Sequence, residues 1–306
     1  MALEADYLVD RRRLKRRLAF WRVLAVVTAV GLVAVAVGRV DGVRGLSRGD
    51  YVSRMDVEGI ILDDPRRRAA LRRIAEDDGA KALILRIDSP GGTVVGGEAL
   101  YRTLMEVAAK KPVVAVMGQL GTSAGYMVAL PAHRIFAREG TITGSIGVLF
   151  QTTDATGLMD KIGVNIGAIR SGPLKARPNP FEKMTPEARE ATQTLVDDMY
   201  GMFLAMVTAR RGMAEDKVRR LADGRVYTGR MALANGLVDA IGGEDEARLW
   251  LESEKKIAAD LPVRDIRIKR EVEDWLEYAG SLAGKTVLSE RLTLDGLVSV
   301  WHPEIQ

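Results

Sequence analysis

The residues with the clearest capacity for chemistry lie in the stretch "GTSAG", residues 121–125. The spacing Gly-x-Ser-x-Gly is typical of a nucleophile elbow, a sharp turn between a strand and a helix that presents a serine hydroxyl. A serine becomes a nucleophile only when a neighbouring group takes its proton. The chain has only two histidines, His133 and His302, so the base that would serve Ser123 has to be identified.

Neither histidine fits easily. His302 follows the serine, as the histidine of an α/β-hydrolase does, so an α/β-hydrolase using Ser123 with His302 stays open. However, no HGGG-type loop precedes Ser123, and His302 lies in the terminal segment "SVWHPEIQ". His133 lies ten residues after Ser123, where we expect it to cap the end of the same short helix, too far along to reach back. We expect both histidines at the surface.

Backbone groups near Ser123 can stabilise an oxyanion. The apolar stretch "KALILRID", residues 81–88, predicts a buried strand that ends in a turn, "SPGG", at residues 89–92. Consecutive glycines let the backbone bend, so that the N–H of Gly92 points into a cleft. The N–H of Ala124 at the start of the next helix can point the same way, and the helix dipole adds positive potential.

A lysine can replace histidine as the base when its surroundings favour the neutral amine. Lys175 lies in "IRSGPLKARPNP", residues 169–180, a Gly- and Pro-rich loop that follows an apolar stretch. Functional side chains often lie in such loops. The spacing alone favours a solvated loop lysine, as most lysines are.

The composition narrows the classes of function. The 306 residues include no cysteine, which excludes disulfides, thiol nucleophiles and zinc sites with cysteine ligands. The net charge of +4 comes largely from "RRRLKRR" at 11–17, and the basic run at 65–73 fits one solvated helix face. Because no aromatic residues alternate with these basic residues, we expect no nucleic-acid partner. We expect no metal and no cofactor.

An apolar stretch follows the basic run, at residues 18–38. It approaches the length of about 20 residues that crosses a bilayer, with Trp21 at the interface and Arg22 near one end. The positive flank predicts a cytoplasmic N-terminus, residues 1–17, and translocation of everything that follows. A cleaved signal peptide and a buried core helix are the alternatives.

The elements that would hold the site alternate between strands and helices. After a linker at 39–50, we expect a strand at 51–61, a helix at 65–79, the strand at 81–88, a helix at 98–110 and a buried strand at 112–118. A short helix at 122–132, a strand at 164–170, a helix at 186–211 with Thr185 as its N-cap, and two short helices within 214–242 follow. This rhythm predicts an α/β fold, a parallel sheet with flanking helices.

The chain resembles the signal peptide peptidase A family in several linked motifs. "IDSPGG", "GTSAGYMVAL", "TGSIGV", "IRSGPLK" and "DGRVYTGRMALANGLVDAIG" occur in the family's order and spacing, between about residues 51 and 245. The resemblance implies the Clp-protease/crotonase fold, Ser123 as nucleophile, Lys175 as general base and Ser145 as the residue that orients the lysine. Relatives usually carry "AASGG" where this chain has "GTSAG", which leaves the shape of the pocket open. The Clp protease has a histidine where this chain has Val148, which favours the lysine.

The resemblance also implies a biological setting. It implies a bacterial inner-membrane serine endopeptidase whose catalytic domain, residues 51–245, lies on the extracytoplasmic side. A C-terminal extension at 246–306 would follow this domain. Its substrates would be cleaved signal peptides and other apolar peptides, and its assembly a homo-oligomeric ring, an octamer, in which Ser123 and Lys175 can come from neighbouring chains. Two other classes remain: a crotonase-type acyl-CoA enzyme, and a membrane scaffold without catalysis.

Overall fold

The computed structural model describes residues 17–18, 20–30, 49–266, 268 and 298–300. The chain divides into two units, Met1–Gly49 and Asp50–Gln306. In the first unit, residues 17–18 and 20–30 are helical with exposed side chains. Among the helices of the described residues, none is long and apolar enough to cross a membrane. Most of the predicted N-terminal segment (1–16), the end of the predicted anchor (31–38) and nearly all of the predicted linker (39–48) lie outside the described residues.

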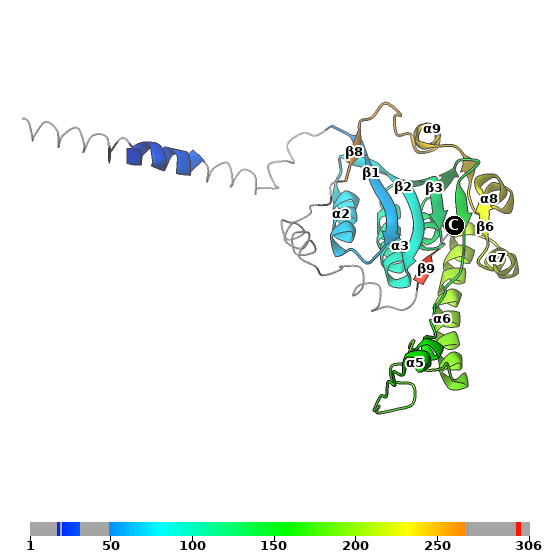
Figure 1. The fold of residues 1–306 in the computed structure, drawn as a ribbon. Helices are drawn as coiled ribbons and strands as arrows, with labels where there is room; N and C mark the ends of the chain where they lie inside the picture. The colour runs from blue at the N-terminus through cyan, green and yellow to red at the C-terminus, as the bar shows by residue number, and fades with distance from the viewer. Residues whose placement is uncertain (1–16, 19, 31–48, 267, 269–297, 301–306) are drawn as a thin grey trace, which may run out of the picture. The chain divides into compact units, whose positions relative to one another are not determined.

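The second unit is built on a mixed sheet whose main strand order is β6-β5-β3-β2-β1-β8 (Figure 1). Its described strands are β1 (Tyr51–Ile61), β2 (Ala80–Thr93), β3 (Val113–Thr122), β4 (Arg134–Ala137), β5 (Ile142–Gly144), β6 (Val226–Thr228), β7 (Ala240–Ile241), β8 (Val263–Asp265) and β9 (Val298–Val300). The central strands β1, β2 and β3 are parallel, whereas β5 pairs with β6, and β2 with β9, in antiparallel orientation. The predicted parallel sheet is therefore confirmed at its centre, but the whole sheet is mixed.

Helices cover both faces of the sheet. They are α2 (Pro65–Glu76), α3 (Val94–Ala108), α4 (Ala124–Ala129), α5 (Thr156–Ile162), α6 (Pro186–Arg211), α7 (Glu215–Leu221), α8 (Gly229–Asn235) and α9 (Glu244–Lys255). Because side chains alternate along a strand, Leu83 and Leu85 of β2 pack in the core that includes α2, α3 and α4. Ile84 packs in the opposite core with Leu251 of α9. The predicted boundary at residue 245 thus falls inside α9, a helix that packs against the sheet.

The expected turn at 89–92 is wrong, because β2 continues through "SPGG" to Thr93. The pairs Ile60↔Gly91 and Ile61↔Gly92 keep this segment on β1, after a register shift in each strand. A Cβ on Gly92 would lie 1.9 Å from the Ile61 carbonyl oxygen. The glycines therefore permit a close approach of two strands rather than a reversal of the chain.

The segment from residue 149 to 200, which we call the arm, packs little against the sheet. Only Ala188 within it is buried, and Figure 1 shows α5 and the N-terminal half of α6 projecting from the sheet. The predicted helix at 186–211 is confirmed, and the Thr185 hydroxyl accepts the Ala188 N–H at 3.2 Å. The predicted strand at 164–170 is wrong: this stretch is irregular, and residues 164–169 are exposed. None of the described strands pairs with it, so its backbone groups have no ladder to join.

Two glycines of α6 should respond to alanine in opposite directions. Gly201 lies inside the helix with nothing within 4 Å of an added Cβ, so Gly201→Ala should raise the free energy of unfolding by about 0.5–1 kcal/mol. Gly212 ends the helix at φ +60, so Gly212→Ala should lower it by about 1 kcal/mol. Chemical denaturation of both variants measures the two effects. Destabilisation by Gly201→Ala would mean that another surface packs against this side of α6.

Candidate active site

Ser123 lies at the junction between β3 and α4, in a strained backbone conformation. Its φ is 56° and its ψ −120°, a region that residues other than glycine rarely adopt. The Ser123 N–H donates to the Gly144 carbonyl of β5 at 2.8 Å, and the residue is 1% exposed. Such strain persists only where the surrounding structure holds it, and it is common at catalytic residues. Ser123 is therefore held in a sharp, strained turn from strand to helix.

Small residues let α4 approach the sheet. Every residue of α4 is buried, and Ala124 is its first residue, so the Ala124 N–H has no acceptor within the helix. A Cβ on Gly97 of α3 would lie 3.0 Å from the Ala124 Cβ. A Cβ on Gly125 would lie 3.0 Å from the Ser89 carbonyl oxygen of β2. The start of α4 is thus wedged between α3 and β2, and Ser123 is fixed against the end of β2.

The C-terminal end of α4 is held from α6. The Arg210 guanidinium donates to the carbonyls of Leu130 and Pro131 at 3.0 and 3.1 Å. Within α4, the Tyr126 hydroxyl donates to the Leu237 carbonyl at 2.8 Å, and burial raises the pKa of that phenol. The helix that begins directly after the serine is therefore anchored at its end and along its length.

Gly92 lies in the part of β2 that extends beyond its pairing with β3. The last pair between these strands is Ser89↔Gly121, directly before Thr122 and Ser123. Beyond it, the backbone of Gly91–Thr93 pairs with the antiparallel strand β9. This edge therefore accepts an extended segment beside the serine, as a peptide adds to a sheet.

Ser145 follows β5 at the same edge of the sheet. Thr122 of β3 pairs with Gly144 of β5. Ser123 directly follows Thr122 and Ser145 directly follows Gly144, so the two serines leave neighbouring strands at the same level. Ser145 is 9% exposed, has a φ of 49°, and donates its N–H to the Arg225 carbonyl at 2.8 Å. The hydroxyl of Thr143 in β5 donates to the Gly121 carbonyl at 2.7 Å and fastens the segment before Ser123. Sequence reasoning missed Thr143, whose only signal is the alternation in "TITGS".

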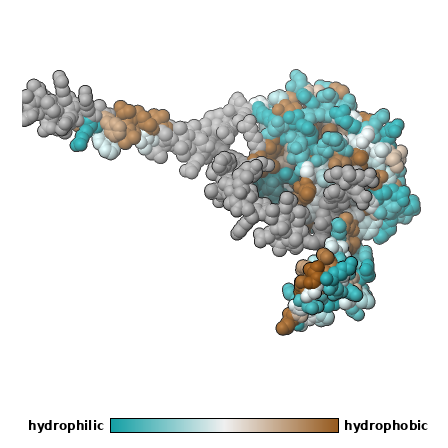
Figure 2. Space-filling model, viewed as in Figure 1, coloured by the Kyte–Doolittle hydropathy of each residue, from teal (hydrophilic) through white to brown (hydrophobic). Residues whose placement is uncertain are grey.

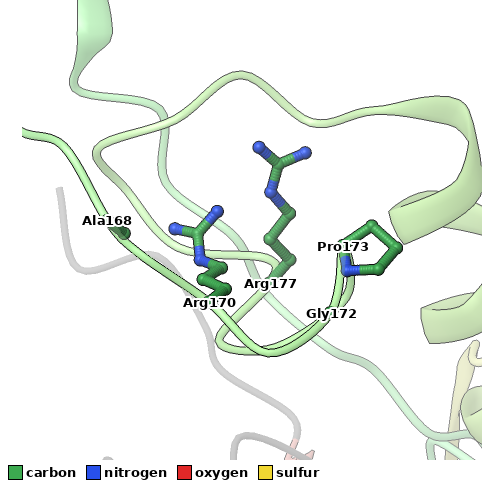
Figure 3. A pocket seen from close by; sticks show the side chains of 5 residues that line it. All are labelled: Ala168, Arg170, Gly172, Pro173 and Arg177. Atoms are coloured by element: carbon green, nitrogen blue, oxygen red, sulfur yellow. The ribbon is translucent and has the colours of Figure 1, made fainter.

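Lys175 lies elsewhere, in a tight turn on the arm, with its side chain exposed. One chain thus presents the two predicted catalytic side chains on separate parts of the fold. Beside Lys175 is a surface pocket lined by Arg170 and Arg177, whose side chains point the same way (Figure 3). Both arginines bind Glu182. The hydrogen bond from Arg170, reinforced by Arg177, lowers the pKa of Glu182 to about 2, so this loop is fastened across neutral pH.

His133 does not serve Ser123 within the chain. Its Nδ1 accepts the N–H of Val113, the first residue of β3, at 3.1 Å, whereas Ser123 follows the last residue of that strand. A ten-residue strand separates the two by about 30 Å. The expectation that His133 caps the short helix is also wrong, since Leu130 is the C-cap of α4. His302 lies outside the described residues. Among the described residues, no group of three or more His, Asp or Glu side chains is placed to hold a metal ion.

Known proteins are similar to this chain over much of its length. Residues 105–258 match the sequence profile described as Peptidase family S49. The chain is 41% identical over 201 residues, 65% of its own length and 72% of the relative's, to "Putative protease slr0021" of Synechocystis. It is 32% identical over 239 residues, 76% of its length and 67% of the relative's, to "Putative signal peptide peptidase SppA" of Enterococcus faecium.

Longer relatives match over part of their length. "Protease 4" of Salmonella typhi is 36% identical over 172 residues, which are 56% of this chain and 28% of that protein. Among solved structures, a mutant of the 1510-N membrane-bound stomatin-specific protease aligns with a TM-score of 0.44 at 17% identity, over 73% of this chain and 100% of that chain.

Proposed function

The chain belongs to peptidase family S49, within the signal peptide peptidase A family of serine proteases, and from this premise we propose that it is an endopeptidase with a Ser123–Lys175 dyad. The observation that carries the proposal is the position of Ser123. It lies in a strained turn beside an edge of β2 that takes up an extended antiparallel segment. A peptide bound along that edge would pass directly over the serine.

In the proposed mechanism, the neutral amine of Lys175 accepts the proton as the Ser123 Oγ attacks the peptide carbonyl carbon. The N–H groups of Gly92 and Ala124 donate hydrogen bonds to the oxyanion of the tetrahedral intermediate. The protonated Lys175 then gives its proton to the leaving amine, and the C–N bond breaks. Water, with Lys175 again as base, hydrolyses the acyl ester and restores Ser123.

The location of Lys175 suggests that the dyad forms between two copies of the chain. Ser123 is buried and Lys175 is exposed on the arm, whose apolar residues Leu158, Ile162, Ile169 and Phe181 are also exposed. Figure 2 shows apolar side chains gathered on this part of the surface. A neighbouring copy would cover them and bring its own serine to the lysine. We propose a homo-oligomeric ring, an octamer, in which Ser145 orients the incoming lysine.

The N-terminal segment supports a membrane setting for this protease. Basic residues at 11–17 precede the apolar stretch at 18–38, the pattern of a single-pass anchor with a cytoplasmic N-terminus. We propose that the catalytic unit has the Clp-protease/crotonase fold and lies on the extracytoplasmic face of a bacterial inner membrane. The proposed substrates are cleaved signal peptides and other apolar or unfolded peptides, and no metal or cofactor takes part.

Covalent labelling tests the nucleophile directly. A fluorophosphonate should modify Ser123 in the assembled wild-type protein, and mass spectrometry should locate the label on the peptide that contains residues 121–130. The variant Ser123→Ala should remain unlabelled, while Ser53→Ala, which removes another fully buried serine, should label as wild type does. Modification of a different serine, or an unlabelled wild-type protein, would contradict this assignment.

A further inference from the structure

Two buried hydroxyls hold one peptide unit of the "SPGG" segment from opposite sides. The Thr122 hydroxyl donates to the Pro90 carbonyl at 3.0 Å. On the other side of the same unit, the Gly91 N–H donates to the Ser89 hydroxyl at 3.1 Å. Thr122 and Ser89 are both 0% exposed. The orientation of the Pro90–Gly91 peptide plane is therefore fixed by one hydrogen bond at its carbonyl and one at its N–H.

The hydrogen bonds continue to the next strand. The Ser89 hydroxyl donates to the Gly59 carbonyl of β1 at 2.6 Å. Gly59 has a φ of +66° and lies at the register shift of β1. A row of hydrogen bonds thus runs from β3 through β2 to β1, at the point where both β1 and β2 depart from regular pairing.

The next peptide, Gly91–Gly92, continues from the pinned one and also contacts the Ser89 hydroxyl. Gly91 has a φ of +118°, and its carbonyl oxygen lies 3.3 Å from the Ser89 hydroxyl. In a trans peptide the N–H is opposite the carbonyl, so the Gly92 N–H points away from Ser89 and β1. That direction is the edge of β2 opposite β1, where the backbone of Gly91–Thr93 pairs with β9. Gly92 cannot shift toward β1 either, because the Ile61 carbonyl already occupies the space a Cβ would need.

We propose that Thr122 is a positioning residue for the oxyanion hole: through the Pro90 carbonyl, its hydroxyl sets the direction of the Gly92 N–H. The inference rests on the proposed function, in which Gly92 donates to the oxyanion. Thr122 directly precedes Ser123 in the chain. One turn therefore carries both the nucleophile and the hydroxyl that orients the Gly92 N–H. The Thr122 hydroxyl thus links the turn that carries the nucleophile to the segment that carries the donor.

Two substitutions at this position separate the hydroxyl from its packing. Thr122→Val keeps the shape and removes the donor, while Thr122→Ser keeps the donor and removes a methyl group. In the assembled full-length protein, we expect Thr122→Val to lower kcat about 10- to 100-fold with KM within about two-fold, because the mis-set donor acts on the transition state. Thr122→Ser should retain kcat within about three-fold of wild type.

A second readout does not depend on turnover. Hydrogen exchange followed by mass spectrometry should show faster exchange of the amides in residues 88–93 in Thr122→Val, and wild-type exchange in Thr122→Ser. Thermal unfolding of both variants shows that each folds.

The outcomes distinguish this inference from the proposed function. A wild-type kcat in Thr122→Val, or equal losses in the valine and serine variants, would overturn the positioning role. Unchanged exchange in Thr122→Val would overturn the pinning of the peptide even if kcat fell. Failure of the wild-type protein to hydrolyse peptides would instead contradict the proposed function, and the exchange measurement would still decide whether Thr122 holds the peptide.

Discussion

Ser123→Ala and Lys175→Ala should each abolish hydrolysis of an apolar peptide, with kcat reduced by about four to six orders of magnitude. The serine supplies the bond-forming oxygen and the lysine its only proposed base, so the two losses should be similar in size. Steady-state turnover of a fluorogenic peptide by the full-length assembly measures both. Circular dichroism and size-exclusion chromatography show that each variant keeps its fold and its assembly.

Matched controls separate the dyad from other effects. Lys183→Ala removes another exposed lysine of the arm, and His302→Ala removes the base of the rival α/β-hydrolase hypothesis. Both should keep kcat within about two-fold of wild type, as expected for groups outside the reacting centre. Full activity in Lys175→Ala, or loss of activity in His302→Ala, would reject the Ser–Lys dyad.

Mixing the two inactive variants should restore activity. If each site takes its serine from one chain and its lysine from the neighbour, random co-assembly of equal amounts of Ser123→Ala and Lys175→Ala leaves about a quarter of the sites with both groups. We therefore expect about a quarter of wild-type turnover from co-expressed chains, purified through a different tag on each. A dyad formed within each chain predicts no recovery, because every chain then lacks one member.

The control for this experiment is co-expression of Ser123→Ala with the double variant Ser123→Ala/Lys175→Ala. These mixed assemblies contain no intact serine and should stay at the background of the single variants. Recovery in this control would reveal contaminating wild-type activity.

The sequence predicts well the elements whose signals are local. The strand at 51–61 and the helix at 186–211 appear with the predicted bounds, because apolar spacing and the cap at Thr185 act within one segment. At "SPGG" the sequence predicts a turn because Pro and Gly usually mark one. The actual role of this segment, a close approach of β1 to Gly92, depends on pairing with a strand some thirty residues away.

The same reasoning explains what sequence patterns miss in the site. The hydroxyl contacts of Thr122 and Thr143 depend on the register of three strands, which no local pattern reports. The stretch at 164–170 has an apolar character that suggests a strand, but a strand also needs a neighbour, and none of the described strands pairs with this stretch. The motifs could name the lysine as a base but could not say from which chain it acts.

The exposed arm has a consequence for the protein concentration at which proteolysis can begin. If Lys175 works only in the site of a neighbour, a single newly made chain carries a serine without its base and cannot cleave the peptides around it. Activity then appears by mass action, once enough chains have met for the arms to dock, and it disappears on dilution. Such a protease would be inactive during synthesis without a removable pro-segment, because the concentration of chains is then too low for assembly.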